Sequence, residues 1–416
     1  MKAKKLLILG GNPETAALVS VANDMGVHSI VVDPVPNSPA KKVAHEAHEV
    51  DGLDVDALEK LAIKLDVDGV LVGVADILVP SYKELCERMG FPCYATDGAL
   101  SAFSSKDGFV NTCEEFGIDT TPSFSELEAI NGLIPEVIYP VLIKPVDNGS
   151  GVGQVICFKK SEILPGISYA KSHSKSGRVL IEKYMQCDDM FAYYAFANDG
   201  AHLLATADRH KSIKSGSVCL GATYPSKYEE EYKKVTDLKI VKFLNSLKLK
   251  NGVLNIQFFV SGSDFFAYDP GFRLQGEGPH IHISHACGFD QRKLLINFSL
   301  GNVDNASLGC SECNVKLSYS NAVTVWVLLA PGKITSIQGL TEIIELPSVI
   351  DIVQRYNVGE TVYEEMIGTE QQVFARIYLQ ADTRQAVEHD VNKLSDLLRI
   401  KNEANQCLIL DIFRYE

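Results

Sequence analysis

Long apolar runs, a positive net charge and closely paired cysteines are all missing from this chain of 416 residues. No segment approaches the roughly 20 consecutive apolar residues of a membrane-spanning helix. The apolar run after Met1–Lys5 ends at Gly10, so a secretory leader is not expected either. The net charge of −14 argues against a nucleic-acid backbone as the main partner. We therefore expect a cytoplasmic protein that acts on small molecules.

Three familiar site signatures are missing as well. The glycine turn at residues 10–13 lacks Gly-x-Gly-x-x-Gly, although Asp33 lies where dinucleotide-binding folds place an acid, so a nicotinamide or flavin cofactor is disfavoured. No Gly-Lys-Ser/Thr opens a helix, which excludes a P-loop. Among the ten cysteines, Cys310 and Cys313 have the closest spacing, and no second pair completes a zinc site. The cysteines are expected to be reduced thiols, with disulfides as the less favoured alternative.

The chain does contain, first, an alternation of apolar strands and amphipathic helices over about residues 1–100. This alternation predicts a parallel, doubly wound, Rossmann-like sheet. Gly11, Asn12 and Asp33 follow strand ends and would face the crevice at the carboxyl edge, where part of a small substrate could bind. Strands are predicted at 6–9, 28–32, 69–72 and near 92–95, and helices at 14–25, 54–65 and 77–89.

A glycine-rich turn between two predicted strands is the strongest site signal. Residues 140–143 form an apolar strand that ends at Lys144, a cation well placed to neutralise phosphate charge. After it, Gly149, Gly151 and Gly153 alternate with small residues, so the backbone can approach a ligand and direct N–H groups toward it. The stretch indicates a phosphate site, with a solvated glycine hairpin as the alternative.

Three more stretches continue the series. Ser105-Lys106-Asp107 opens a predicted helix, and residues 179–185 form a strand of sequence Val-Leu-Ile-Glu-Lys-Tyr-Met. Residues 252–260 and 266–273 then form two further strands. Together with the glycine loop, these stretches resemble the ATP-grasp superfamily, specifically its carboxylate–amine ligases and the related biotin carboxylase, carbamoyl-phosphate synthetase and purine-pathway enzymes. The resemblance covers about residues 1–300.

The resemblance implies a nucleotide site built from these stretches, with a lid over about residues 112–185. Two lysines and the glycine loop would hold the phosphates, a hinge strand would read adenine, and a carboxylate would bind ribose. The residues in these positions are Lys106 and Lys144, then Gly149, Ser150, Gly151 and Gly153, then Glu182, Lys183 and Tyr184, and Asp189, with Asp188 as an equally near choice.

The resemblance also implies that ATP is used together with Mg²⁺, or with Mn²⁺. Gln257 and Asp269 would be oxygen ligands on adjacent strands, the donors that a hard cation prefers. Arg273 would act on the transferred phosphoryl group as a catalytic residue, with Lys144 as the second. The chain departs from the family pattern in two ways, because Asp269 replaces a glutamate and Gly271 stands where an asparagine ligand is expected. The number of bound ions is therefore left open.

Two polar stretches outside this series are further candidates for substrate contacts. Residues 208–217 are basic and are predicted to form a loop, which binds a phosphate or a substrate or is simply solvated. Residues 280–285 carry three histidines, which line the substrate pocket or are structural, since no nearby cluster of acids or cysteines favours zinc. The substrate candidates from both stretches are Arg209, Lys211, Lys214, His280 and His282.

The last hundred residues are predicted to form a separate lobe of short strands at 322–329, 332–337, 373–379 and 408–415, with a helix at 383–398. The expected fold class is α/β and α+β multidomain. A Rossmann-like N-terminal domain (1–100) precedes an ATP-grasp domain (101–301) and a C-terminal α/β lobe (302–416).

The function that the resemblance implies is ATP-dependent ligation. A small-molecule carboxylate would be activated as an acyl phosphate with release of ADP, and then coupled to an amine such as an amino acid. A bicarbonate-activating carboxylase of the purine or biotin type is one alternative, and a nucleotide-binding regulatory protein without turnover is another. A homodimer is the family expectation. No short motif identifies the acid or the amine.

Overall fold

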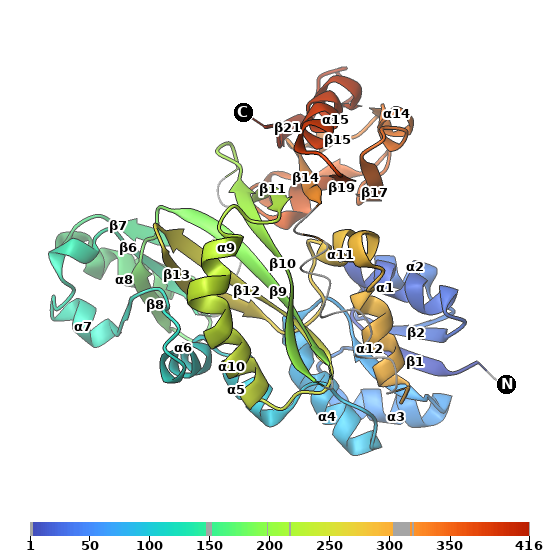
Figure 1. Cartoon of the computed structure of the whole chain (residues 1–416), viewed down its shortest axis with the longest axis horizontal. Helices are drawn as coiled ribbons and strands as arrows, with labels where there is room; N and C mark the ends of the chain where they lie inside the picture. The colour runs from blue at the N-terminus through green and yellow to red at the C-terminus, as the bar shows by residue number, and fades with distance from the viewer. Residues whose placement is uncertain are drawn as a thin grey trace.

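A four-stranded parallel sheet, ordered β3-β2-β1-β4, forms the N-terminal part of the computed structural model (Figure 1), which describes residues 3–146, 152–197, 199–215, 218–302, 317 and 320–415. The predicted doubly wound arrangement is thereby confirmed. Its elements are β1 (Lys5–Leu9), α1 (Pro13–Asp24), β2 (His28–Val32), α2 (Pro39–Val43), β3 (Glu46–His48), α3 (Val55–Leu65), β4 (Gly69–Val72), the 3-10 turn η1 (Asp76–Leu78), α4 (Val79–Met89) and α5 (Asp97–Phe103).

Short polar side chains set where several of these helices begin. Asn12, Asp54 and Ser105 each accept a hydrogen bond from the backbone N–H three residues further on, which satisfies a donor that the first helical turn leaves free. The Ser105 cap makes Lys106 the first residue of α6 (Lys106–Glu115). A local capping preference thus fixes the position of a predicted phosphate-binding lysine.

Two antiparallel sheets follow (Figure 1). The smaller has the order β5-β8-β6-β7 and the larger the order β13-β12-β9-β10-β11-β14-β19-β17, with β21 beside β14. The smaller sheet and its helices are β5 (Ser123–Phe124), α7 (Glu126–Ile130), β6 (Val141–Pro145), β7 (Val155–Cys157), α8 (Ile163–Ser172) and β8 (Val179–Lys183). The larger sheet begins with β9 (Asp188–Ala197), β10 (Gly200–Lys211), β11 (Cys219–Tyr224), α9 (Glu229–Tyr232), α10 (Leu238–Ser246), β12 (Gly252–Ser261) and β13 (Asp264–Gly271), followed by α11 (Pro279–Cys287) and α12 (Gln291–Ser299).

The larger sheet continues without a break into the C-terminal lobe, because β11 pairs antiparallel with β14. The domain boundary predicted at residue 302 thus separates strands that belong to one hydrogen-bonded sheet, and it stays a prediction. The remaining elements are β14 (Asn321–Leu329), β15 (Gly332–Lys333), β16 (Ser336–Gln338), α14 (Leu340–Ile344), β17 (Val349–Gln354), β18 (Thr361–Val362), β19 (Val373–Ala381), α15 (Arg384–Leu397), β20 (Arg399–Lys401) and β21 (Ile409–Ile412).

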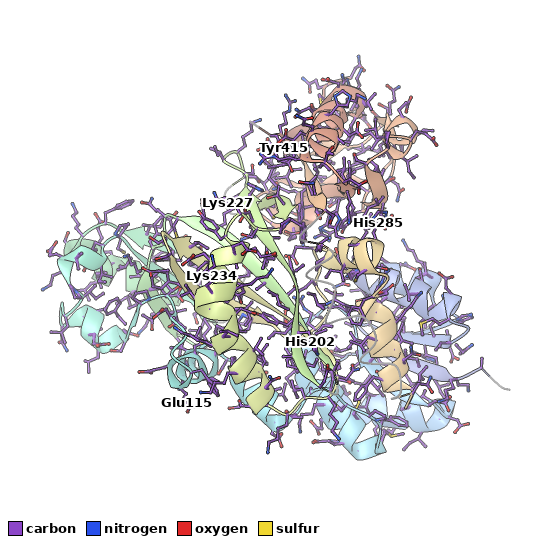
Figure 2. All side chains as sticks on the ribbon, viewed as in Figure 1. Glu115, His202, Lys227, Lys234, His285 and Tyr415 are labelled. Atoms are coloured by element: carbon purple, nitrogen blue, oxygen red, sulfur yellow. The ribbon has the colours of Figure 1, made fainter. Side chains whose placement is uncertain are left out.

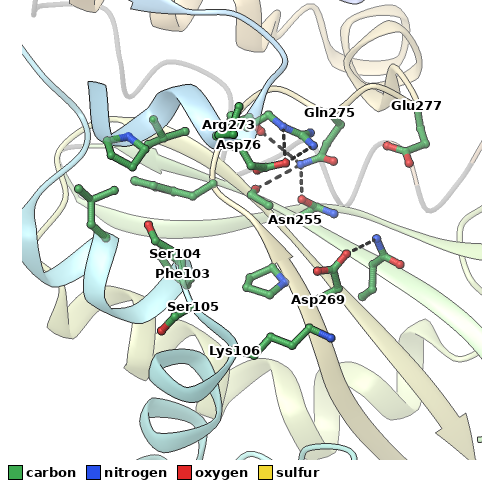
Figure 3. A pocket seen from close by; sticks show the side chains of 18 residues that line it. Asp76, Phe103, Ser104, Ser105, Lys106, Asn255, Asp269, Arg273, Gln275 and Glu277 are labelled. Carbon is green, nitrogen blue, oxygen red and sulfur yellow. Dashed lines mark hydrogen bonds and ion pairs between the residues drawn. The ribbon is translucent and has the colours of Figure 1, made fainter. Parts of the chain in front are cut away.

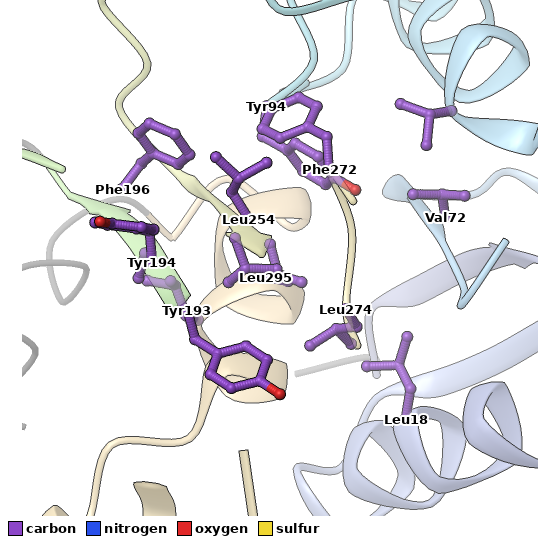
Figure 4. Close-up of a cluster of buried hydrophobic side chains, with 14 of the residues drawn as sticks. Leu18, Val72, Tyr94, Tyr193, Tyr194, Phe196, Leu254, Phe272, Leu274 and Leu295 are labelled. Atoms are coloured by element: carbon purple, nitrogen blue, oxygen red, sulfur yellow. The ribbon is translucent and has the colours of Figure 1, made fainter. Parts of the chain in front are cut away.

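One hydrophobic core joins the N-terminal sheet to the larger sheet (Figure 4). Leu18 of α1 and Val72 of β4 belong to the same cluster as Leu254 of β12 and Phe272, which follows β13. The Tyr94 ring meets Phe272 edge-on, with ring centroids 5.2 Å apart. Because this packing continues up to the residue before Arg273, it fixes the predicted catalytic arginine against the N-terminal part. None of the helices within the described ranges has the length and apolar character needed to cross a bilayer.

Two contacts tie the lobes together beyond this core. Arg376 of β19 is 3% exposed and reaches Glu14 of α1, with its Nη1 2.5 Å from the carboxylate, and Glu370, with its Nη2 2.7 Å away. At the opposite end of the larger sheet, the amide of Ala267 in β13 donates to the carbonyl of Asp119 at 2.8 Å. Asp119 lies just before β5, so the smaller sheet is anchored beside the outer strand of the larger one.

Three sequence-based expectations of local structure are wrong. Residues 92–95 are irregular, since Pro92 has no N–H to donate and the amide of Tyr94 bonds a tyrosine hydroxyl instead of a strand. Residues 208–211 are the end of β10 and not a loop: all four pair with β11, and Asp208 and Arg209 also pair with β9. Seven described cysteines are free thiols, but Cys287 is disulfide-bonded, so the chain is not fully reduced.

Candidate active site

Two lysines and one glutamate from three elements converge at the centre of the candidate site. Lys144 lies on β6, Glu182 lies on the adjacent β8, and Lys106 opens α6. Lys144 Nζ is 2.5 Å from Glu182 Oε2, and Lys106 Nζ is 3.7 Å from Glu182 Oε1. Both predicted phosphate-binding lysines therefore share one carboxylate. A phosphate that enters the site would compete with that carboxylate for two cations at once.

This crowding changes the acidity of Lys106. Its position deep in the cleft lowers the pKa of Lys106; Glu182 raises this pKa and Lys144 lowers it further, to about 8 overall. A phosphate group beside the amine would favour its charged form. An anion that binds beside Lys106 would therefore raise the pKa of this amine again.

The predicted hinge residues offer fewer backbone donors than expected. The amide of Lys183 donates to the carbonyl of Pro122 at 2.8 Å, and that of Tyr184 donates to the carbonyl of Pro140 at 2.9 Å. Their N–H groups are already hydrogen-bonded, so only their carbonyl groups remain to bond an adenine ring. Met185 follows directly, and its amide donates to no backbone carbonyl in the part of the chain that the structure describes. Sequence reasoning did not single out this hinge donor.

The predicted metal residues face each other on adjacent strands. Gln257 of β12 lies opposite Asp269 of β13, and its Nε2 donates to Asp269 Oδ2 at 3.3 Å. Tyr268 donates its hydroxyl to Gln257 Oε1 at 2.5 Å, a contact that sequence reasoning missed. Asp269 is open to the cavity but lies deep in the cleft, and the loss of hydration there raises its pKa to about 6, although Lys106 opposes the shift. A nearby cation would stabilise this carboxylate.

Asp189, and not Asp188, faces this site. Successive side chains of a strand point to opposite faces, and Asp188 lies on the far side of β9. Asp189 is 3% exposed, and its Oδ1 lies 3.0 Å from the hydroxyl oxygen of Tyr268. It also pairs with Lys211 at 2.8 Å and with Arg209 at 3.3 Å. Asp189 is therefore the one of the two acids that contacts Tyr268, and it pairs with two of the predicted substrate cations.

A cavity of about 490 Å³ opens between the N-terminal part and the ends of β12 and β13 (Figure 3). Arg273 lies on its wall and donates to Asp76 Oδ2 from Nη2 at 2.6 Å and from Nε at 3.1 Å. Asp76 belongs to η1, so the N-terminal part reaches the predicted phosphoryl site through this pair. The other polar lining residues are Ser104, Ser105, Lys106, Asn255, Gln257, Asp269, Gln275 and Glu277.

Of the predicted glycine loop, Gly153 lies within the described residues, whereas Gly149, Ser150 and Gly151 lie outside them. Gly153 has a φ of +76°. A Cβ at this position would come within 2.6 Å of His173 Cβ, so both its conformation and its surroundings require glycine.

None of the five predicted substrate residues lines the 490 Å³ cavity, and Arg209, Lys211 and Lys214 line the cavity between β10, β11 and the C-terminal segment instead. Lys214 turns toward the C-terminal lobe, where its Nζ lies 3.5 Å from Asp411. His282 of α11 is fully buried, with its Nε2 3.0 Å from Thr324 Oγ1 of β14, and His280 is buried on the same helix. Burial lowers the pKa of both histidines to about 3, so they are neutral at ordinary pH. The His282 contact joins α11 to the larger sheet.

The donor atoms present fit magnesium bound together with a nucleotide. No group of three or more His, Cys, Asp or Glu side chains that could hold a metal occurs among the residues that the structure describes. The carboxylate of Asp269 is accompanied by the amide groups of Gln257 and Asn255 along the cavity. Such hard oxygen donors suit Mg²⁺ when phosphate oxygens complete its coordination.

Two more cavities adjoin the site. One of about 420 Å³ lies between α6, β8 and β13 and is lined by Lys106, Thr121 and Glu182 among others. The other, of about 970 Å³, lies between β10, β11 and the C-terminal segment, and Lys227 and Tyr415, labelled in Figure 2, belong to its walls. The Lys227 ammonium is 2.8 Å from a carboxylate of its own wall, so this cation is already neutralised.

Two family descriptions match the chain. "Ribonucleotide synthetase preATP-grasp domain" matches residues 3–96, and "D-ala D-ala ligase C-terminus" matches residues 117–246. Among curated proteins, the chain is 28% identical over 248 residues to a formate-dependent phosphoribosylglycinamide formyltransferase from Methanococcus maripaludis. That match covers 56% of this chain and 63% of the relative, which is less than two thirds of the relative's length.

Solved structures match over nearly the whole chain. Phosphoribosylglycinamide synthetase from Anaerococcus prevotii has a TM-score of 0.78 at 16% identity and covers 97% of this chain and 100% of its own. L-amino acid ligase from Bacillus licheniformis has a TM-score of 0.76 at 14% identity with the same coverage. The biotin carboxylase domain dimer of Hydrogenobacter thermophilus 2-oxoglutarate carboxylase, in complex with MgADP and bicarbonate, has a TM-score of 0.75 at 15% identity and covers 96% of this chain and 90% of its own.

The fold and the matches define one class of protein. The arrangement of a preATP-grasp sheet, a small antiparallel sheet and a large antiparallel sheet is the ATP-grasp fold. The two matched family models, at residues 3–96 and 117–246, agree with the resemblance to the ATP-grasp superfamily that the motifs indicated.

Proposed function

We propose that the protein is an ADP-forming, ATP-dependent ligase that joins a small-molecule carboxylate to an amine. The observation that carries this proposal is the convergence of Lys106, Lys144 and Glu182 beside the oxygen donors Gln257 and Asp269. The curated relative supports the same chemistry, since its name specifies formate, a carboxylic acid, as the source of the group it transfers. The likeness to an L-amino acid ligase is compatible with an amino acid as the amine.

In the first proposed step, a carboxylate oxygen of the substrate attacks the γ-phosphorus of ATP, an acyl phosphate forms, and ADP leaves. Lys144 and Lys106 offset the negative charge of the phosphates. Arg273, once it exchanges Asp76 for a phosphoryl oxygen, stabilises the group in transfer. A magnesium ion held by Gln257 and Asp269 would supply further charge neutralisation.

In the second step, the amine nitrogen attacks the acyl carbon, a C–N bond forms, and the bond from carbon to the phosphate oxygen breaks. Inorganic phosphate leaves, and the proton lost by the nitrogen passes to phosphate or solvent. The chemistry requires no covalent intermediate on a side chain. It does require a closed site, because water would hydrolyse the acyl phosphate.

Nucleotide products resolved by chromatography test the proposal. The protein is incubated with MgATP, pooled small carboxylic acids and hydroxylamine as a trapping amine. ADP together with a hydroxamate supports acyl-phosphate chemistry, whereas AMP and pyrophosphate would exclude it. Lys144→Ala is expected to abolish product while the fold is retained, since it removes the cation nearest Glu182. Lys171→Ala is the matched control, because Lys171 lies on α8 and pairs with Glu126 at 2.6 Å, outside the site.

The same assay separates the alternatives. If this chain is instead a bicarbonate-activating carboxylase, like the Hydrogenobacter domain that shares its fold, it would form ADP when bicarbonate replaces the pooled acids. We further propose a cytoplasmic homodimer, and light scattering after size exclusion tests the oligomeric state.

A further inference from the structure

The chain carries Gly271 at a position that faces Asn255 across the β12–β13 pair. A Cβ built on Gly271 would lie 2.2 Å from Asn255 Oδ1, far closer than two such atoms can approach. The space in which a side chain at position 271 would begin is therefore filled by the Asn255 carboxamide. Asn255 is 4% exposed and lines the same cavity as Gln257 and Asp269.

The hydrogen bonds of Gln275 identify the Asn255 atom that fills this space. The Gln275 Nε2 donates to Asn255 Oδ1, to the carbonyl of Gly271 at 3.3 Å and to the carbonyl of Arg273 at 3.2 Å. Two of these partners are backbone carbonyls, which only accept, so the group facing them is the NH₂ of Gln275. The Asn255 atom that it meets must then be the oxygen. Figure 3 shows Gln275 and Asn255 joined in this way beside Asp269.

The strand geometry places this oxygen among the predicted metal donors. Asn255 and Gln257 are two residues apart on β12 and share one face, and Asp269 and Gly271 do the same on β13. The four positions form the corners of one rectangle on two paired strands. Three corners carry oxygen donors and the fourth carries no side chain.

We propose that Asn255 supplies the amide oxygen ligand that Gly271 lacks, so that the ligand has moved to the opposite strand. The proposal rests on the proposed function, since the cation it concerns is the one that accompanies the nucleotide. Gln275 acts as the positioning residue that aims the Asn255 oxygen. Asn255 and Gly271 have then exchanged roles across the two strands. The glycine at position 271 makes room for the Asn255 side chain and is not a sign of lost catalysis.

Binding of Mn²⁺ as a probe for Mg²⁺ tests the proposal without turnover. The electron paramagnetic resonance signal of free Mn²⁺ gives its affinity for the full chain with saturating ADP, and calorimetry gives ADP affinity in EDTA. Asn255→Ala is expected to weaken Mn²⁺ binding at least about tenfold, and metal-free ADP affinity is expected to stay within about twofold. Asn255→Asp, which keeps an oxygen in place, is expected to retain Mn²⁺ binding. Asn131→Ala at the end of α7, an exposed carboxamide that lines none of the three cavities, is the control.

An exchange of the pair keeps the proposal falsifiable should Asn255→Ala fail to fold. Asn255→Gly with Gly271→Asn returns the carboxamide from the other strand and is expected to restore Mn²⁺ affinity to within about threefold of the unmodified chain. Gly271→Asn alone is expected to fail, because its side chain meets Asn255. Unchanged Mn²⁺ affinity in Asn255→Ala, or an exchanged pair as weak as that variant, would overturn the proposal. An unmodified chain that binds no ADP would instead refute the proposed function, and this inference with it.

Discussion

The ion cluster around Arg376 gives a sharp prediction for stability. The Arg376 guanidinium is 3% exposed and bonds Glu14 of α1 and Glu370, and its carbon stacks over Trp326 at 5.6 Å from the ring centroid. Glu14 is itself largely buried, with 13% of its side chain exposed. Arg376→Met would leave a carboxylate in the interior without its main partner.

The expected cost follows from that burial. Removing one member of a buried ion pair lowers the free energy of unfolding by about 3–5 kcal/mol, because the remaining charge is poorly hydrated. With an unfolding entropy of about 2 cal/mol/K per residue, this corresponds to a fall of roughly 4–6 °C in Tm for a chain of this length. Glu14→Gln combined with Arg376→Met is expected to cost less than the single change, since no unpaired charge remains.

Urea unfolding followed by circular dichroism measures the difference, with Arg384→Met as the control. Arg384 also pairs with a glutamate, Glu388 at 2.5 Å, but 71% of its side chain is exposed, so its loss is expected to cost less than about 0.5 kcal/mol. If Arg376→Met loses no more stability than Arg384→Met, the buried cluster does not stabilise the fold and the reasoning is wrong.

The pH dependence of the free energy of unfolding provides a second test of the same ion cluster. Burial raises the pKa of Glu14, but Arg376 and Arg355 lower it by more, so its pKa in the folded chain lies below the ordinary 4.5. The ionised carboxylate therefore contributes stability above pH 4.5, and this contribution is lost as the pH falls through the folded pKa. The stability difference between the unmodified chain and Glu14→Gln is expected to shrink in that acidic range.

Two further predictions concern the site. Metal-free ADP affinity is expected to fall as pH rises through about 8, because Lys106 then loses its proton. Calorimetry on Lys106→Met, which has no proton to lose, is expected to give a flatter dependence of ADP affinity on pH. An equal slope in the two proteins would contradict the assignment. Arg273→Ala is expected to lower turnover more than ATP affinity, because Asp76 holds Arg273 when no phosphate is present; steady-state kinetics that show a loss confined to affinity would exclude its role in the transition state.

Most of the first hundred residues and the order of the site elements could be predicted from sequence. Apolar periodicity located β1, β2 and β4 closely, because four successive residues of each strand are buried and helices separate the strands. The strand near 92–95 was wrong because local apolar character does not show whether a sheet edge is available. The continuity of the larger sheet past residue 302 could not be predicted, since strand pairing between β11 and β14 is set by tertiary contacts.

The candidate site divides in the same way. Lys106, Lys144, Gln257 and Asp269 were located because each stands in a local motif on a predictable element. Asn255 was missed because its part depends on its neighbour across the strand pair, and nothing near it in sequence refers to Gly271. His280 and His282 looked like site residues because polar groups so near Arg273 suggest a pocket, yet both are buried on α11, where His282 contacts the larger sheet.

The hydrogen bond between Ala267 and Asp119 has a mechanical consequence. β13 is the outermost strand of the larger sheet, and an open strand edge is prone to pair with other chains. Here the segment that leads into the smaller sheet covers the middle of that edge, two residues before Asp269. A rotation of the smaller sheet would thus pivot on a point attached to the strand that carries Asp269. Because this pivot lies beside the predicted oxygen donors, closure of the smaller sheet need not displace the side chains that would hold the magnesium ion.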